Sequence, residues 1–231
     1  MPITAAPSRR ERLRAQTLAE IRELGFAQVA EGGPAALSLA GIAKAMGMSG
    51  PALYRYFASR DDLLVALIEE CYEDLADTLT EVAYQTRSDT PEERLRAALN
   101  ASREWALSQP HRYRLVFGSP YGSGELDPDR IIRPAQRAMD VALAALSELG
   151  PPERATTVSD SVLRRELANW GNSSENSPHD PRVLLIGLLA WTRMHGIISL
   201  EIEGFFKQVR VDPARLYQAE IDHLVAQRTG Q

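Results

Sequence analysis

Side chains that commonly bind phosphate gather in one short stretch near the front of the chain. Tyr54, Arg55 and Tyr56 follow one another, and Arg60 comes shortly after them. Tyrosine hydroxyls and guanidinium groups donate hydrogen bonds to phosphate oxygens in protein–DNA complexes, and arginine also binds guanine. These residue types at this spacing therefore predict contact with a nucleic acid.

The residues just before this stretch are small. Because Gly50, Pro51 and Ala52 have small side chains or none, the backbone at the start of the stretch can approach base edges closely. Small apolar groups at such a tip can touch thymine methyl groups. Phosphate contacts fix the register of a protein on DNA, whereas base contacts specify the sequence. The predicted DNA contacts are Ser38, Lys44, Ser49, Gly50, Pro51, Ala52, Tyr54, Arg55, Tyr56 and Arg60.

Two short helices joined at Gly47 would position these side chains. Ser38 can cap the first helix, and Ala43 supplies the small side chain that two crossing helices need. A short turn that contains glycine is typical of a helix-turn-helix, whose second helix enters the DNA major groove. The expected core residues are Ile42, Met46, Met48, Leu53 and Phe57. Similar corners occur in α proteins that bind no DNA, and the aromatic run would then be core.

The rest of the chain also has helical periodicity, and no run of alternating β-branched residues predicts a strand. We therefore expect an all-α protein, in which an N-terminal three-helix domain is joined by a long helix to a larger helical domain. The expected helices cover residues 9–31, 38–46, 49–57, 59–84, 91–108, 111–117, 129–149, 158–170, 181–206 and 213–227. Polar, turn-rich loops are expected at 118–128 and within 171–181.

The charge of the chain is unevenly distributed. Residues 1–60 hold eight lysines and arginines and four acidic residues, which gives this front part a net charge of +4. The whole chain of 231 residues carries −5, so the remainder carries −9. A basic front on an acidic protein favours contact of the front with a polyanion, while the rest keeps the protein soluble.

Other kinds of chemistry find little support in the sequence. The single cysteine, Cys71, excludes an intramolecular disulfide and suits a reducing cytoplasm, where we expect the protein. The first residues lack the apolar core of a secretory signal. The four histidines are scattered, and no catalytic motif stands out, so neither metal nor cofactor is predicted. The apolar run Val183–Trp191 is about half the length of a membrane span and predicts a buried helix, so no membrane partner is expected.

The stretch from Arg10 to Cys71 resembles the DNA-binding domain of the tetracycline-repressor (TetR) family. The resemblance rests on Leu39-x-x-Ile42-Ala43, Gly47-Met48-Ser49, Ala52-Leu53-Tyr54-x-Tyr56-Phe57 and Ser59-Arg60-Asp61-x-Leu63-Leu64. The family often has lysine in place of Arg60 and histidine in place of Tyr56, and both replacements keep a hydrogen-bond donor. The C-terminal part resembles the family's WHG-type ligand-binding domain through Trp191-x-x-x-His195-Gly196, His111–Pro120 and Glu201–Phe206.

The resemblance implies a DNA-binding domain at residues 9–71 and a ligand-binding and dimerisation domain at 72–228. It implies a homodimer that pairs through its last two long helices. The expected helix at 183–206 is compatible with this because it is apolar nearly all round, although such a helix can also form the centre of a monomer's own core. It further implies a transcriptional regulator, a repressor that binds a palindromic operator and is released by a small molecule.

A small-molecule pocket in the C-terminal helices is also implied by the resemblance. Candidate lining residues are Trp105, Tyr113, Phe117, Met139, Trp170, Trp191 and His195. For each of these residues singly, ordinary core packing is the competing interpretation. Two other functions stay open at the level of sequence, a helical enzyme and a protein-interaction scaffold. The enzyme requires a catalytic constellation that the sequence does not show, and the scaffold would not require Tyr54, Tyr56 and Arg60 together.

Overall fold

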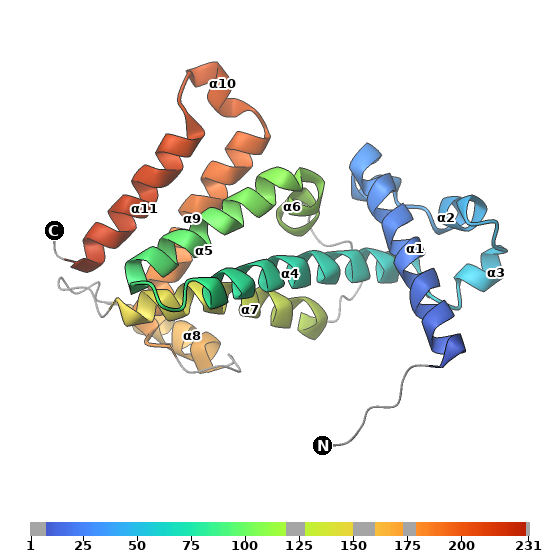
Figure 1. The fold of residues 1–231 in the computed structure, drawn as a ribbon, viewed down its shortest axis with the longest axis horizontal. Helices are drawn as coiled ribbons and strands as arrows, with labels where there is room; N and C mark the ends of the chain where they lie inside the picture. Colours follow the sequence, from blue (N-terminus) through green and yellow to red (C-terminus); the bar gives the residue numbers. More distant parts are fainter. Residues whose placement is uncertain (1–7, 119–127, 150–159, 173–178, 230–231) are drawn as a thin grey trace. The chain divides into compact units, whose positions relative to one another are not determined.

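The computed structural model describes residues 8–118, 128–149, 160–172 and 179–229, and these residues form helices without a strand. The predicted all-α class is therefore confirmed. Figure 1 shows the helices in chain order. They are α1 (Arg9–Gly32), α2 (Leu39–Ala45), α3 (Gly50–Leu53), α4 (Arg60–Gln85), α5 (Pro91–Ser108), α6 (Pro110–Phe117), α7 (Pro128–Glu148), α8 (Ser161–Asn172), α9 (Pro181–Ile202), α10 (Phe205–Val209) and α11 (Pro213–Thr229), with a 3-10 turn at Pro34–Ala36.

The chain divides into two compact units that do not follow a single cut in the sequence. The first unit comprises residues 1–71 together with 111–131, and the second comprises 72–110 together with 132–231. Helix α4 begins in the first unit and ends in the second. The predicted domains at 9–71 and 72–228 were defined by function and not by compactness, so that division stays a prediction.

Helix α1 is well capped but little buried along its first half. Ser8 and Glu11 form a reciprocal capping box, in which the Ser8 hydroxyl accepts from the backbone of Glu11 and the Glu11 carboxylate accepts from the backbone of Ser8. The first fully buried residue of the helix is Ile21. Only the second half of α1 is therefore held by the core, where the helix packs against α2 and the 3-10 turn.

The helix-turn-helix consists of α2, a turn at Gly47 and α3. Ser38 caps α2, because its hydroxyl accepts from the backbone of Gly41 at 3.2 Å. Gly47 has a φ of 63°, in the left-handed region that favours glycine. Leu53 and Phe57 are buried beneath the unit, as the sequence predicted. Helix α3 is shorter than expected, since regular helix ends at Leu53 and the residues up to Tyr56 continue as a turn.

Alanine at Gly47 should destabilise the first unit, whereas alanine at Gly50 should not. A Cβ in the left-handed region costs about 1–2 kcal/mol of unfolding free energy. Gly50 has no positive φ and has open space where a Cβ would lie. Alanine at Gly50 should therefore leave the stability unchanged and can affect only contacts with DNA. Chemical denaturation of the two variants measures the difference. Equal loss of stability in both would contradict the role of the left-handed turn.

The N-terminal part of α4 is joined to later segments within the first unit. Ser59 begins this helix by accepting from the backbone of Asp62 at 3.0 Å, as predicted. Arg112 of α6 lies with its guanidinium 4.2 Å from the centre of the Phe26 ring. Arg130 binds Glu69 at 2.7 Å and Asp62 at 3.4 Å. Residues around α6 and the start of α7 are thus structural parts of the first unit.

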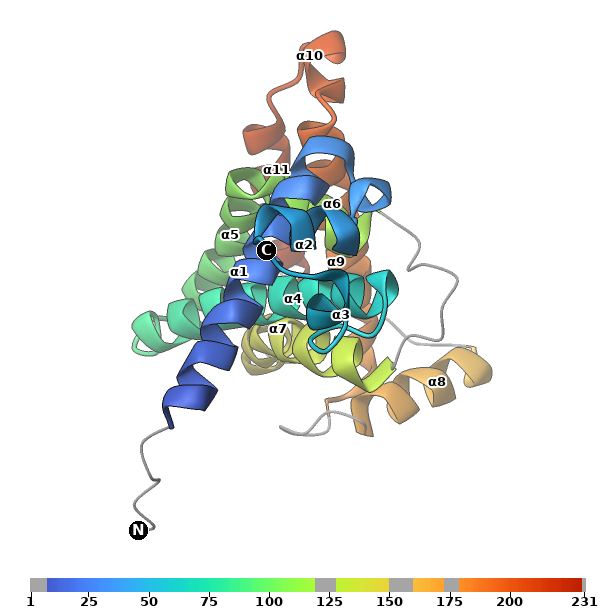
Figure 2. The ribbon, with the colours of Figure 1, turned by 90° about the vertical axis from the view of Figure 1, so that its right-hand side faces the viewer.

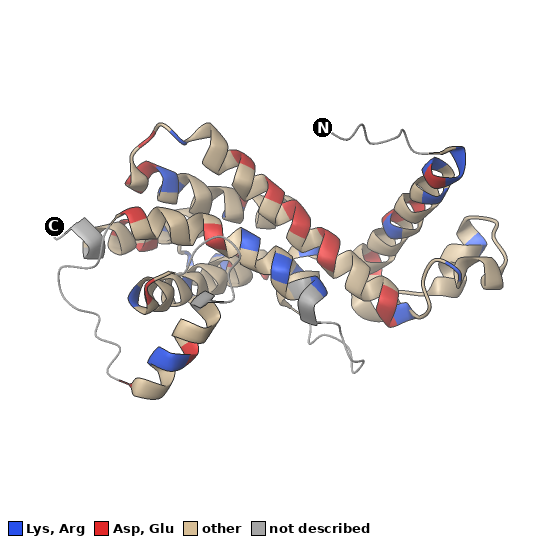
Figure 3. Cartoon of the chain, turned by 90° about the horizontal axis from the view of Figure 1, so that it is seen from below, with Lys and Arg blue, Asp and Glu red and all other residues tan. Residues whose placement is uncertain are grey.

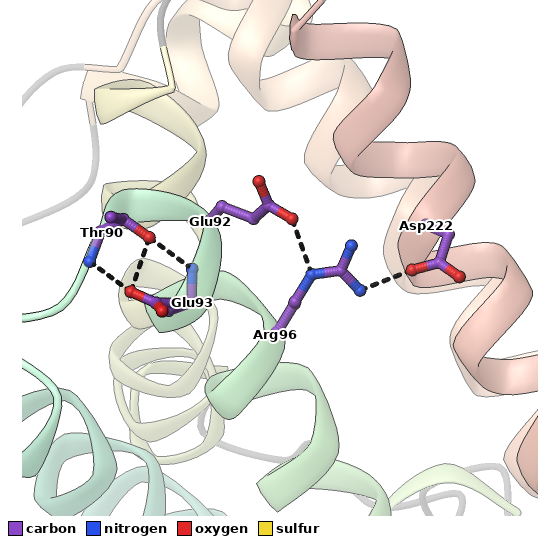
Figure 4. A network of polar contacts seen from close by, with 5 residues as sticks. All are labelled: Thr90, Glu92, Glu93, Arg96 and Asp222. Carbon is purple, nitrogen blue, oxygen red and sulfur yellow. Dashed lines mark hydrogen bonds and ion pairs between the residues drawn. The ribbon is translucent and has the colours of Figure 1, made fainter. Parts of the chain in front are cut away.

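The second unit is built around α5, α9 and α11, which pack against one another. Figure 4 shows one of the polar contacts that fix α5. Thr90 and Glu93 form a capping box at its first turn. One turn further on, Arg96 binds Glu92 at 3.0 Å and reaches Asp222 of α11 at 2.6 Å. Local capping and a contact distant in sequence therefore orient the same end of the helix.

Helix α9 is the most apolar helix that the structure describes. Of the described helices, it alone has the length and composition of a possible membrane span, with a mean hydropathy of 1.6. It packs against α5, α8, α10 and α11, and residues such as Leu184 and Met194 are buried, which fits the predicted buried helix. The expected continuation to Phe206 was wrong, because α9 ends at Ile202 and Gly204 turns the chain with a φ of 73°.

Candidate DNA-binding surface and effector cleft

The predicted DNA contacts, apart from Arg60 at the start of α4, lie in the helix-turn-helix, on α2 and its cap and on the segment that includes α3. Lys44, Ser49, Pro51, Tyr54 and Arg55 are exposed, and Tyr54 has an exposed fraction of 57%. Gly50, Ala52 and Tyr56 are partly exposed. Leu53 lies among these residues in the sequence and Phe57 follows them, and both are buried, as expected of a short helix that packs on a core. This arrangement can present hydroxyl and cationic donors to an anionic polymer.

The two serines of the surface differ in what their hydroxyls do. The Ser38 hydroxyl accepts from Gly41, and the backbone N–H of Ser38 donates to the Gln28 side chain at 2.8 Å, which ties α2 to α1. The Ser49 hydroxyl makes no capping hydrogen bond although Ser49 precedes α3. Both hydroxyl protons are consequently available to a phosphate oxygen.

Two cations of the surface have no acidic partner in the described part of the chain. Lys44 and Arg55 form no ion pair with any residue that the structure describes, and both are exposed. By contrast, Arg22, Arg112 and Arg130 of the same unit bind carboxylates of α4. The cations of the first unit thus separate into those that hold the fold and those that face solvent.

Arg60 belongs with the cations that hold the fold. Its Nε donates to the carbonyl oxygen of Leu37 at 3.2 Å, a terminal nitrogen donates to the carbonyl of Pro34, and the other binds Asp61 at 2.9 Å. These bonds join the start of α4 to the 3-10 turn before α2. The geometry favours a bracing role over the predicted phosphate contact, which stays a prediction.

The seven candidate pocket residues do not form one site. Tyr113 and Phe117 pack on each other within the first unit, with ring centres 5.0 Å apart. In the second unit, buried Trp105 donates through Nε1 to Asp74 at 2.8 Å. Trp191 stacks on His195 with ring centres 5.3 Å apart, and 38% of Trp191 is exposed. Met139 and Trp170 share a small cavity that Leu143 and Leu184 also line.

A larger cleft of about 600 Å³ lies in the second unit, and sequence reasoning missed it. Its lining combines cations, acids and small apolar groups. The lining residues are Thr80 and Ala83 of α4, Arg94 of α5, Arg133, Gln136, Arg137, Asp140, Val141, Ala144, Ala145 and Glu148 of α7, and His179. The signal was present in α7, where Arg133, Arg137 and Asp140 recur at helical spacing along one side.

The cations of the cleft differ in how far they are already bound. Arg94 pairs with Glu148, and Arg137 pairs with Glu73 and with Asp77. Arg133 is exposed and forms no ion pair among the described residues. It is therefore the guanidinium that an anionic group entering the cleft would meet without first displacing a carboxylate.

The cleft and the small cavity of Met139 and Trp170 adjoin. Gln136, Asp140 and His179 line both. His179 lies between Ser147, whose hydroxyl is 3.2 Å from Nδ1, and Asp140, whose carboxylate is 3.8 Å from Nε2. A ligand in the cleft would hence lie near Trp170, one of the predicted pocket residues.

Acid should destabilise the protein partly through His195. Burial lowers the pKa of His195 below its ordinary value of about 6.5. The unfolded chain then binds more protons than the folded one, so the free energy of unfolding falls as pH drops from about 6.5 through the lowered pKa. Replacing His195 with glutamine should flatten this part of the stability profile. Identical profiles for both proteins across this range, measured by urea unfolding, would contradict the assignment.

Comparison with known proteins identifies the class to which this fold and surface belong, the helical DNA-binding regulators. Residues 21–67 match the family described as bacterial regulatory proteins, tetR family, and residues 95–224 match the tetracyclin repressor-like C-terminal domain. The second match alone covers more than half of the chain. The protein belongs to the TetR family of transcriptional regulators, as its resemblance predicted.

The sequence matches between this chain and other transcriptional regulators extend over nearly the whole length of both proteins. The HTH-type transcriptional regulator Rv1816 of Mycobacterium tuberculosis is 33% identical over 227 residues, which is 96% of this chain and 97% of the relative. The corresponding regulator Mb1846 of Mycobacterium bovis matches equally. Among solved structures, regulatory protein SCO4313 is 36% identical with a TM-score of 0.76, over 95% of this chain and 98% of the other.

A more distant structure shares the fold alone. The transcriptional regulator FadR from Bacillus subtilis, solved in complex with stearoyl-CoA, is 16% identical with a TM-score of 0.55. The match covers 90% of this chain and 98% of that one. Helical domains of this architecture therefore tolerate extensive change of sequence, and the likeness assigns no ligand to the present chain.

Proposed function

We propose that this regulator is a repressor that binds a palindromic operator as a homodimer and is released by a small-molecule effector. The observation that carries the DNA contact is the exposure of Tyr54 and Arg55 above the buried Leu53, on a helix-turn-helix whose turn is set by Gly47. In a dimer the two α3 helices would lie about 34–36 Å apart, or a multiple of that distance, along the operator.

Dimerisation is supported by apolar side chains exposed near the end of the chain. Leu189 and Leu200 of α9 are each 43% exposed, and the exposed Phe205 and Leu216 follow on α10 and α11. Gly196 lies between Leu189 and Leu200 on one side of α9, with open space beside it, which would allow a partner helix to approach closely. Such a surface is more apolar than a monomer usually leaves in water.

The effector is proposed to bind in the cleft of the second unit and to carry an anionic group. The support is the guanidinium of Arg133, which has no ion pair among the described residues, in a lining that includes Ala83, Val141 and Ala144. A carboxylate or phosphate on a modest apolar body matches this lining. Its effect on DNA requires that it bind the DNA-free and DNA-bound states differently.

Release can be tested by mobility shift on DNA flanking the protein's own gene, with carboxylate and phosphate ligands added in turn. Coupling of about 1–3 kcal/mol would change DNA affinity roughly 5–150-fold. By linkage, operator DNA must weaken ligand binding by the same factor. A protein that shifts no DNA fragment overturns the proposal, and one that shifts DNA but responds to none of the ligands is a constitutive regulator.

Ligand entry can be located by tryptophan fluorescence. A ligand in the cleft should change the emission of Trp170, which lines the adjoining cavity, and the change should disappear in Trp170→Phe. Trp191→Phe is the matched control, because Trp191 stacks on His195 and lines neither cavity. A signal that survives Trp170→Phe and disappears in Trp191→Phe would place the effector elsewhere.

A further inference from the structure

A second basic surface lies beside the helix-turn-helix. The first turns of α1 and the segment around α3 enclose a groove of about 670 Å³ within the first unit. Figures 1 and 2 both show α1 extending past α3 in this region. The described lining includes four arginines, Arg9, Arg10, Arg14 and Arg55, and no carboxylate.

The four guanidinium groups have no acidic partner among the described residues. Arg14 instead lies over the ring of Tyr56, 5.3 Å from its centre, which orients the two side chains on opposite walls of the groove. Figure 3 shows basic residues on the first turns of α1, with acidic residues also present along the helix. A groove with this charge and without internal compensation is complementary to a polyanion.

The placement of the arginines on α1 is selective. At about 3.6 residues per turn, Arg9, Arg10 and Arg14 fall on one side of the helix together with Leu13 and Thr17, and these residues line the groove. Arg12 falls on the opposite side and does not line it. The helix therefore directs three of its four early arginines towards α3.

The same arginines are unfavourable for the helix itself. Arg9 and Arg10 occupy the first turn of α1, where the positive end of the helix dipole favours acidic residues. No residue of α1 before Ile21 is buried, so core packing does not explain this part of the helix. A local conflict of this kind is expected at a functional site.

We propose that this groove binds the DNA phosphate backbone next to the segment contacted by α3, with Arg9 and Arg10 as phosphate contacts and Arg14 as the residue that positions Tyr56. This proposal rests on the proposed DNA binding and extends it from the helix-turn-helix to α1. The apolar Leu13 and Ala52 lie in the groove and can contact deoxyribose between successive phosphates.

The test is the salt dependence of binding to a mixed-sequence DNA duplex for the full-length protein, Arg9→Gln/Arg10→Gln and Arg12→Gln. Each phosphate contact contributes about 0.9 to the slope of log affinity against log salt, so the double variant should lower the slope by about 1.8 per subunit and about 3.6 per dimer. Arg12→Gln removes one charge from the same turn, half of what the double variant removes, and should change the slope little. Thermal unfolding of the double variant should occur at an equal or higher temperature, because repulsion from the helix dipole is removed.

The outcomes distinguish failure of the proposed groove contacts from failure of the proposed DNA binding as a whole. An unchanged slope in the double variant, with DNA still bound, overturns the groove alone. A fall in Arg12→Gln that is as large per charge removed, about half of the fall in the double variant, overturns it too, since the effect would then follow net charge and not position. Failure of the unaltered protein to bind any duplex at about 50 mM salt overturns the proposed DNA binding, and the groove with it.

Discussion

Replacing Arg55 with glutamate should abolish operator binding while leaving the fold intact. Arg55 is exposed, binds no described acid and lies beside Ala52 and Tyr56, so no internal contact is lost. A well-placed arginine contributes about 1–3 kcal/mol to recognition of a base, and a dimer loses this twice. The added carboxylates would also repel phosphates. Fluorescence anisotropy with labelled operator DNA measures the loss, and circular dichroism checks the fold.

Arg165→Glu is the matched control for this change. Arg165 is an exposed arginine of α8 in the second unit, and it forms no ion pair with a described residue. The substitution makes the same change in net charge far along the chain from the helix-turn-helix. If both variants lose affinity to the same extent, the effect of Arg55 is one of net charge, and its proposed contact with DNA is wrong.

Replacing Arg103 with alanine should destabilise the second unit more than any surface change. Arg103 of α5 forms two parallel hydrogen bonds with Glu201 of α9, at 2.9 and 2.6 Å, and its guanidinium lies 5.6 Å from the ring centre of Tyr217. The two charged side chains are only 17% and 15% exposed. Removing one partner leaves a buried charge unpaired, which costs about 3–5 kcal/mol.

A double-mutant cycle separates the unpaired charge from the loss of packing. In Arg103→Met/Glu201→Met both charges are removed and most of the apolar contact is kept, so the protein should recover much of the stability that either single methionine variant loses. Urea unfolding of the three variants gives the interaction energy. Strictly additive losses would show that the pair does not hold α5 to α9 as its geometry indicates.

The parts of the fold that the sequence predicted correctly are those marked by local signals, namely helix caps and a glycine turn. Ser38 and Ser59 cap helices where hydroxyl side chains precede an apolar period, and Gly47 provides the left-handed turn between α2 and α3. These features act over a few residues, so they are legible without tertiary information. The same reasoning placed the DNA-contact candidates from Ser49 to Tyr56 on the segment around α3, because neighbours in sequence stay neighbours there.

The features that were missed depend on contacts between distant residues. Arg60 stands where the family often has lysine and keeps a hydrogen-bond donor, yet its donors meet the carbonyls of Pro34 and Leu37, which only the folded chain brings near. The cleft is lined by residues of α4, α5 and α7 and by His179. These segments are distant in sequence, so no short motif predicts that they lie together. Gly204 lies in a stretch whose apolar period continues on both sides, so periodicity could not locate the end of α9.

The discontinuity of the first unit bears on how the two parts of this protein could be exchanged between regulators. Glu69 and Glu70 lie before the boundary at Cys71, but their partners Arg130 and Arg112 are supplied by residues 111–131. A recombination event with one crossover after residue 71 would transfer the acids without these cations. A chimera keeps these ion pairs only if it carries both segments, and the second segment lies inside the C-terminal family match.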